Sequence, residues 1–388
     1  MQKSKANLQS KERSKERESG IELLKLLAIF LIVTYHMTQT LSGRFPNLPG
    51  AEGAFLDLRA ATSDPTKLVL MLVRNFGALG NHLFFVCSAW FLVDRKVGKP
   101  RKLAGMLMDN WLASVLILAA FLLLGQSVPM STAAKCLMPA TFGLNWYVTA
   151  YVLFYLVHPY LNRMMDAMSQ RELLGMALTL LLLYTVVPMV YPGLFVPSNL
   201  MMFLTLYVAV GYMKKYMVRF TQNRRANVII FLLSAVLMNG IVLGFNFLGV
   251  KGIYVAEDLF RFVGWGDCVF TVLMAVSLLN LFRSIRFTSV FINRISALSL
   301  LIYVIHENVL VRQYLRPRIW VWLHSTFGYE HLLGLVLALA AVVLVSSIVL
   351  AWIYKNTLGR LVSKLSEKAT ALVGKVCGGI ADRLMKIE

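Results

Sequence analysis

The chain has 388 residues, of which 58% are hydrophobic and only 15% charged, and its mean hydropathy is +0.67. This composition excludes an ordinary soluble domain and indicates an integral membrane protein that crosses the bilayer several times. The formal net charge of +20 does not point to a nucleic-acid partner, because the basic residues are confined to short segments between apolar stretches. The four cysteines show no spacing typical of a metal site or a disulfide framework, so we expect no metal.

Apolar stretches of membrane-spanning length recur along the chain and predict an all-α, polytopic fold with about ten transmembrane helices. We expect a disordered basic tail (1–19), a transmembrane domain (20–355) and a basic, amphipathic tail (356–388). An even number of crossings puts both ends on the same side of the membrane. The segments on that side are rich in Lys and Arg, which predicts that both termini are cytoplasmic.

The first predicted span, residues 20–41, carries three ionisable residues, Glu22, Lys25 and His36. Such groups are costly in hydrocarbon and usually face a cavity or a partner. Lys25 and His36 are eleven residues apart, which puts them on one helix face, roughly 16 Å apart along the axis. The pattern predicts a helix that lines a cavity. The alternative is that Glu22 and Lys25 reach the cytoplasmic interface while His36 caps the other end.

An imidazole is the side chain most easily tuned to act as a base near neutral pH. In a wet cavity His36 could take the proton of a sugar hydroxyl, with a carboxylate or amide partner that the sequence does not identify. Lys25, at the inner mouth, could hold the phosphates of an anionic cofactor that arrives from the cytoplasm. The spacing between these two residues suits a long carrier arm with a phosphate head and a reactive thioester.

Further polar residues lie in later spans. Arg74, in the predicted span 68–93, is either a second donor ligand or the partner of Asp109 or Asp267. Trp146, at the predicted outer mouth of the span 142–161, suits a sugar-stacking platform, although aromatic residues also form the interfacial belt of membrane proteins.

The predicted span 295–312 ends in a densely polar turn that contains His306, Glu307 and Arg312. Arg316 and Arg318 follow, so basic residues gather on the predicted outer side, against the usual orientation bias. These arginines are either a tolerated exception to that bias or part of a site for an anionic group. Because His306 and Glu307 are near, the sequence favours residues that contact an acceptor or line a pore, and the arginines hint that the acceptor is acidic.

Five features occur in the order and spacing of one family. They are a basic residue followed after ten residues by His in the first span, its opening GIELLKLLAIF, and the stretches LFFVCSAWFLV (83–93), NWYVTAYVLFYLVHPYLNRM (145–164) and SLLIYVIHENVLVRQYL (299–315). Together they resemble the membrane acyltransferase 3 family over about residues 20–355. Its members are integral-membrane O-acyltransferases that modify bacterial surface glycans, and the last stretch is most similar to the exopolysaccharide-modifying branch.

The resemblance implies a multi-pass enzyme of the bacterial cytoplasmic membrane that takes acetyl groups from cytoplasmic acetyl-CoA. His36 would be the essential base, Lys25 would occupy the donor position usually held by Arg, and His306 matches the Tyr-x-x-His element. The acceptor would be a hydroxyl of a cell-surface or secreted polysaccharide, or of a lipid-linked glycan. Membrane lipid and polysaccharide-assembly proteins would be further partners.

Three positions depart from the family pattern: Lys25 lacks the bidentate fork of Arg, Ala89 replaces a Gly, and residues 99–102 (KPRK) replace an Arg-rich run. A transporter or flippase for an anionic or lipid-linked sugar would explain the charges within the membrane equally well. It would not explain the ordered family stretches. A non-catalytic scaffold would not need Lys25 and His36 on one face.

Overall fold

The computed structural model describes residues 19–43, 48–49, 52–190, 198–253 and 258–384, and within these segments all regular structure is helical. The predicted tail 1–19 therefore lies outside the described residues, apart from Ser19. The longer helices are α2 (Gly20–Leu41), α3 (Pro65–Leu92), α4 (Pro100–Leu123), α6 (Trp146–Ala167), α9 (Asn199–Tyr216), α11 (Arg224–Val250), α12 (Val269–Arg283) and α16 (Leu332–Leu384). Shorter ones are α5 (Met130–Leu137), α7 (Gln170–Leu181), η1 (Leu182–Val186), α8 (Val187–Val190), α10 (Val218–Gln222), η2 (Leu259–Gly266), α13 (Val290–Ser296), α14 (Ser299–His306), η3 (Val311–Leu315), α15 (Arg316–Phe327) and η4 (Tyr329–His331).

The predicted all-α membrane fold is confirmed. By length and composition, 6 helices among the described residues could each cross a membrane: Gly20–Leu41, Pro65–Leu92, Pro100–Leu123, Gln170–Val190, Arg224–Val250 and Tyr329–Cys377. Two predicted spans are divided instead. The segment 258–282 forms η2 followed by α12, and the segment 295–312 breaks after α14. A count of ten crossings stays a prediction.

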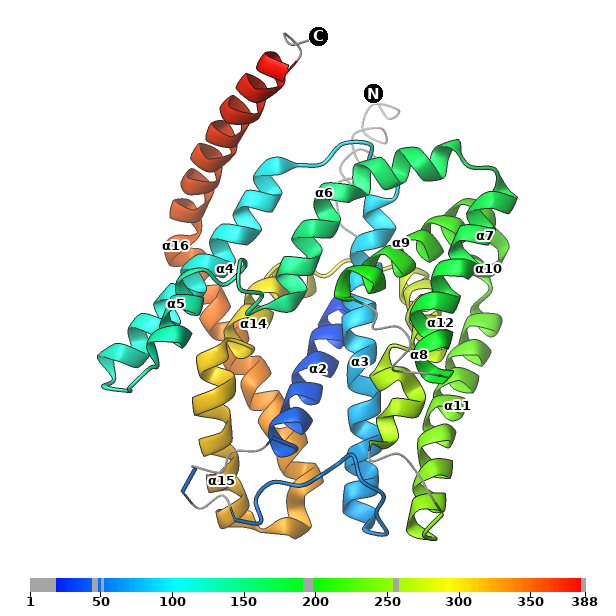
Figure 1. Ribbon diagram of the computed structural model, residues 1–388, viewed down its shortest axis with the longest axis vertical. Coiled ribbons are helices and arrows are strands. Elements are labelled where there is room, and N and C mark those ends of the chain that lie inside the picture. The colour runs from blue at the N-terminus through cyan, green and yellow to red at the C-terminus, as the bar shows by residue number, and fades with distance from the viewer. Residues whose placement is uncertain (1–18, 44–47, 50–51, 191–197, 254–257, 385–388) are drawn as a thin grey trace, which may run out of the picture.

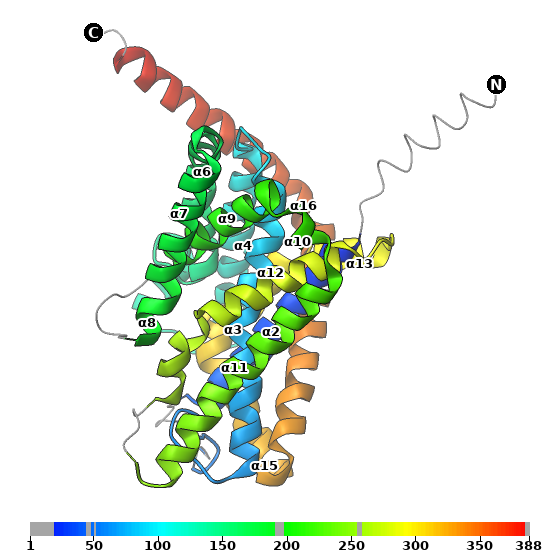
Figure 2. The same ribbon diagram turned by 90° about the vertical axis from the view of Figure 1, so that its right-hand side faces the viewer.

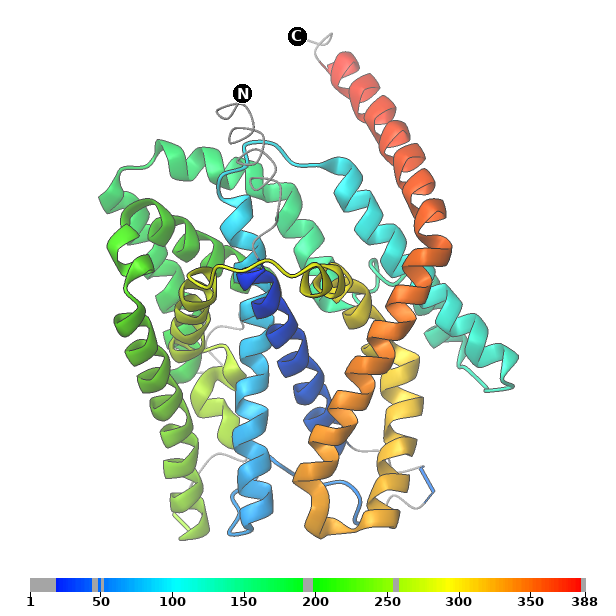
Figure 3. The ribbon, with the colours of Figure 1, turned by 180° about the vertical axis from the view of Figure 1, so that it is seen from behind.

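Helix α2 runs through the middle of the bundle, beside α3 and α16 (Figure 3). Its contact with α3 is close because α3 presents glycines to it. A Cβ on Gly77 would lie 2.2 Å from Cβ of Tyr35, and one on Gly80 would lie 2.7 Å from the carbonyl oxygen of Ala28. These two glycines allow the backbones to approach closely, as small residues do between membrane helices.

The chain between α14 and α15 leaves regular helical geometry inside the protein. Helix α14 ends at His306, and the side chain of Asn308 accepts a hydrogen bond from the backbone N–H of Leu310 at 3.0 Å, which starts the next helical segment. Glu307 and Asn308 are 3% and 1% exposed. Non-helical backbone at membrane depth is tolerated where protein surrounds it, and it often marks a functional site.

Helix α16 is a single helix of 53 residues that projects beyond the bundle, and α2 begins toward this same end (Figures 1 and 2). The helix continues without a break from the predicted transmembrane domain (20–355) into the predicted tail (356–388), and the boundary between them stays a prediction. No proline interrupts the sequence there. Helix α16 is also tied to α4, because Arg101 pairs with Glu367 at 2.5 Å and donates to Ser363 at 3.0 Å. We call the end of the bundle at which α2 begins and α16 projects the basic end.

Candidate functional site

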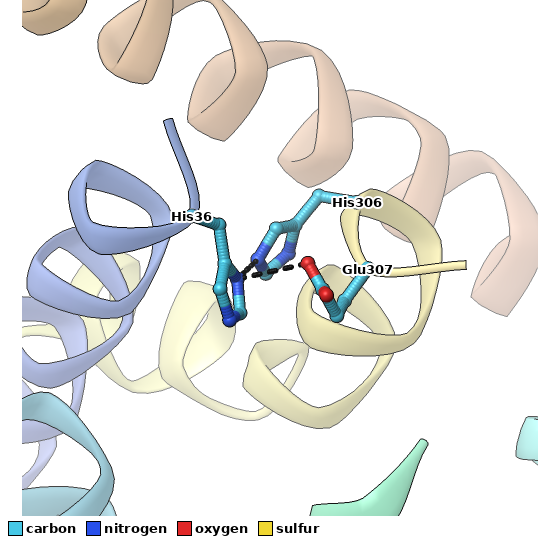
Figure 4. A group of neighbouring side chains, drawn as sticks. All are labelled: His36, His306 and Glu307. Carbon is cyan, nitrogen blue, oxygen red and sulfur yellow. Dashed lines mark hydrogen bonds and ion pairs between the residues drawn. The ribbon is translucent and has the colours of Figure 1, made fainter. Parts of the chain in front are cut away.

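Three buried side chains from α2 and the end of α14 meet in the bundle (Figure 4). Nδ1 of His36 lies 3.0 Å from Nε2 of His306 and 3.0 Å from Oε2 of Glu307. His36, His306 and Glu307 are 5%, 1% and 3% exposed. Residues 270 positions apart in the sequence thus form one network, and the carboxylate partner that His36 requires is Glu307.

The hydrogen bonds assign the protons of this network. Nδ1 of His306 lies 2.7 Å from the carbonyl oxygen of Ile302, which can only accept, so that nitrogen carries the proton. In neutral His306, Nε2 is then an acceptor. Nδ1 of His36 lies between this acceptor and the carboxylate of Glu307, so it carries a proton that both attract. The other nitrogen of His36, Nε2, points away from both partners and is free to accept a proton (Figure 4).

Two arginines hold Glu307 in place. Arg312 donates to Oε1 and Arg316 to Oε2, each at 3.1 Å. Arg316 is 2% exposed and lies in the first turn of α15, directly after the π-helix η3. A buried carboxylate needs such partners, because an unpaired one would cost several kcal/mol of desolvation. The arginines that the sequence assigned to an acidic acceptor therefore have partners within the protein, including Arg318, which donates to Gln126 at 2.8 Å.

The two histidines and the glutamate also have the side chains and spacing of a metal site, with ligand atoms within 4.8 Å of one another. Their surroundings fit a metal poorly. A cation there would face the guanidinium groups of Arg312 and Arg316 and would compete with both for Glu307. The arrangement suits proton transfer better, since Glu307 can orient His36 and stabilise its protonated form.

A large cavity opens at the basic end. Its volume is about 780 Å³, and no acidic residue is among the described residues that line it. The basic residues that line it are Lys25, Arg95, Lys99, Lys102 and Arg283. The run at 99–102, which departs from the family pattern, thus still contributes two lysines. A cavity of this size and charge can hold a phosphorylated cofactor.

Lys25 and Glu22 form an ion pair near the N-terminal end of α2, with Nζ 3.3 Å from Oε1. Glu22 is 1% exposed and also accepts a hydrogen bond from Ser296. Glu22 was expected to contact the acceptor or to line a pore. It lies about four turns from His36 and close to the basic cavity, and its role stays a prediction. Its position suits it to orient Lys25.

Arg74 does not reach this cavity. It donates to Ser42 at 3.0 Å and lies 4.9 Å from the centre of the Phe260 ring, in a pocket of about 20 Å³. Along α3 it is roughly 25 Å from Phe91, which lines the cavity. Arg74 therefore lies far from the basic cavity, and a role for it in donor binding stays a prediction. Its predicted carboxylate partners are also otherwise engaged, with Asp109 2.7 Å from Lys355 and Asp267 3.6 Å from His82.

Trp146 was expected at the outer mouth of a span. Helix α6 instead begins inside the bundle, beside α14, and the half-buried indole packs edge-on against Tyr147 at 5.4 Å. The cause is that the chain after α5 returns into the bundle before α6 starts. The sequence reasoning also passed over the cavity residues Arg95 and Arg283, which resemble ordinary basic residues of cytoplasmic loops.

A family model described as an acyltransferase domain, that of the acyltransferase 3 family, matches residues 18–354. The chain therefore belongs to this family of membrane-bound acyltransferases. No curated protein and no solved structure gives a significant match. The resemblance inferred from the five sequence features is confirmed, and family membership favours an enzyme over a transporter or a scaffold.

Proposed function

We propose that this enzyme transfers an acetyl group from cytoplasmic acetyl-CoA to a hydroxyl of a cell-surface or secreted polysaccharide, or of its lipid-linked precursor. It would act in the bacterial cytoplasmic membrane, with lipid and polysaccharide-assembly proteins around it. The observation that carries the proposal is that α2 joins a basic cavity, at Lys25, to a buried proton-transfer network, at His36.

The two sites divide the work. The basic cavity would hold the phosphates of acetyl-CoA. The thioester arm of acetyl-CoA would extend along α2 from Lys25 toward His36, about 16 Å away by helical rise. The acceptor hydroxyl would approach His36 from the other side. Nε2 would take the hydroxyl proton while the oxygen attacks the thioester carbon, and the leaving sulfur would then receive the proton. Glu307 would stabilise the intervening imidazolium.

A second route fits the same residues. Nε2 of His36 could attack the thioester itself and carry the acetyl group until the acceptor displaces it. This route gives ping-pong kinetics, whereas direct transfer requires donor and acceptor together. Initial rates with both substrates varied separate the two, since parallel reciprocal plots indicate the acyl-histidine.

The cavity's role is tested with purified protein in proteoliposomes that carry polymer extracted from the host, by measuring acetyl-CoA-dependent release of free CoA. Replacing Lys25 with Ala removes one charge-assisted contact, which is worth about 1.5–3 kcal/mol. We expect the KM for acetyl-CoA to rise about tenfold or more with kcat little changed, the signature of lost binding.

Lys215→Ala is the matched control, because Lys215 also lies at the basic end but pairs with Asp166 at 3.7 Å, outside the residues that line the cavity. It should leave both constants unchanged. An unaltered KM in Lys25→Ala would place the donor elsewhere. If wild-type protein neither binds acetyl-CoA nor turns it over, the donor assignment fails.

A further inference from the structure

Helix α6 begins in the interior of the bundle, and no side-chain cap from Asn145 satisfies its first N–H groups. Asn145, the cap residue, is nevertheless 1% exposed and close by. The first N–H groups of any helix lack partners within the helix, and together they carry a partial positive charge. A buried helix start of this kind needs another partner.

Unpartnered polar atoms surround this helix start. Among the described residues, no hydrogen-bond partner reaches Nδ2 of Asn110 or the hydroxyl of Tyr147. The hydroxyl of Tyr303 is approached by the backbone N–H of Tyr147, but its own proton has no acceptor among these residues. Asn110, Tyr147 and Tyr303 are 0%, 3% and 3% exposed. Asn110 and Asn145 share one hydrogen bond of 2.6 Å, which leaves one NH₂ group unused. We call Asn110, Asn145, Tyr147 and Tyr303, with the first N–H groups of α6, the α6 start site.

Each buried polar group without a partner costs about 1–3 kcal/mol. Several together in one place indicate a ligand that satisfies them. Oδ1 of Asn145, an acceptor, is also without a partner among the described residues, whereas the other groups at this site can donate: hydroxyls, the Asn110 amide and backbone N–H. They are also neutral, so they suit a carbonyl oxygen that gains charge briefly. A permanent anion such as phosphate is better matched by the basic cavity.

The α6 start site lies between the basic cavity and the histidines. Tyr151, one turn further along α6 than Tyr147, lines the cavity. The rings of Tyr147 and Tyr303 are 5.9 Å apart, and so are those of Tyr303 and His306. His306 in turn contacts His36. A carrier arm that runs from the cavity toward His36 would therefore pass this site.

We propose that the α6 start site binds the carbonyl oxygen of the donor thioester and stabilises the negative charge that forms on it. This rests on the proposed acetyl-CoA-dependent function. When the acceptor oxygen bonds to the carbonyl carbon, its proton moves to Nε2 of His36 and the C=O electron pair moves onto oxygen. Tyr303, the Asn110 amide and the α6 N–H groups donate to that oxygen. The C=O bond then re-forms, the C–S bond breaks, and the proton passes from His36 to the sulfur.

The direct test replaces Tyr303 with Phe, which removes a single hydroxyl and keeps the ring. Loss of one donor to a developing oxyanion typically costs about 10²–10³ in kcat. We expect a loss of this size in proteoliposomes, with the KM for acetyl-CoA little changed. Asn110→Ala should behave alike and serves as the second variant if Tyr303→Phe does not fold.

Tyr207→Phe is the matched control. Tyr207 is a buried tyrosine of α9 whose hydroxyl donates to Asn162 at 2.6 Å, away from the α6 start site. Its kcat should remain that of the wild type. If Tyr303→Phe and Asn110→Ala also turn over like active wild-type protein, the proposal is wrong. If these variants instead raise the KM for acetyl-CoA and leave kcat unchanged, the proposal is also wrong, because the site would then bind an amide group of the acetyl-CoA arm rather than the reacting carbonyl.

A spectroscopic measurement needs no turnover. Acetyl-CoA labelled with ¹³C at the carbonyl can be bound to His36→Ala protein, in which transfer is blocked. Hydrogen bonds to the carbonyl should lower its infrared stretching frequency relative to free acetyl-CoA, and the shift should disappear in His36→Ala/Tyr303→Phe. A bound carbonyl at the free frequency would contradict the proposal, whereas absence of any bound donor would instead contradict the proposed function.

Discussion

Hydrogen bonds at single atoms decide what His36 can do. Because the carbonyl oxygen of Ile302 fixes the proton of His306, and Glu307 attracts the proton on Nδ1 of His36, the basic nitrogen of His36 is Nε2. Arg312 and Arg316 keep Glu307 from turning away. The chemistry at His36 thus depends on residues from two distant parts of the chain.

Replacing Glu307 with Gln tests this dependence. The change removes the charge that stabilises protonated His36 and leaves the buried Arg316 without its partner. By analogy with other histidine–carboxylate pairs, we expect kcat to fall about 100-fold or more while the KM for acetyl-CoA changes little.

The control is Glu330→Gln, an exposed glutamate of η4, which should be as active as the wild type. Glu307→Asp, which keeps the charge on a shorter side chain, should recover part of the loss. A Glu307→Gln protein that folds and turns over normally would show that the carboxylate does not assist His36.

The position of α2 depends on how closely α3 approaches it. Gly77 faces Tyr35, the residue before His36, so the helix contact and the catalytic candidate are mechanically connected. Glycine in a helix interior normally costs about 1 kcal/mol relative to Ala. At Gly77 this cost is offset by the close contact that only glycine allows.

Gly77→Ala should therefore destabilise the protein despite the better helix propensity of Ala. The new Cβ would lie 2.2 Å from Cβ of Tyr35, so the helices must move apart, at a cost of about 1–3 kcal/mol. Thermal unfolding in detergent should show a lower Tm.

Gly240 of α11 provides the comparison, because a Cβ there meets no atom within 4 Å. Gly240→Ala should leave the Tm unchanged or raise it. If the two substitutions shift the Tm equally, close packing of α2 on α3 is not what stabilises the bundle.

At the scale of the whole molecule, the sequence predicted what depends on position along one helix. The interval of eleven residues between Lys25 and His36 follows from helical geometry, and α2 is indeed one uninterrupted helix from Gly20 to Leu41. Composition likewise predicted the membrane fold. The polar turn at His306 and Glu307 was identified because so many polar groups in an apolar region are unusual.

Contacts between distant segments could not be predicted in the same way. Periodicity within a span does not reveal that α14 brings Glu307 to His36. Each apolar stretch was predicted to be one continuous transmembrane helix. The break after His306 and the start of α6 inside the bundle were therefore not predicted. Asn110 and Asn145 resembled ordinary polar residues of spans, because their missing hydrogen bonds are visible only in three dimensions.

The measurement that tests the central claim most directly is the acetyl content of the surface polysaccharide in cells that lack this protein. These cells would be complemented with wild type or with His36→Ala at equal membrane levels. The account predicts that acetyl groups are lost on deletion, restored by the wild type and not restored by His36→Ala. Acetyl content that is unchanged by deletion, or fully restored by His36→Ala, would contradict it.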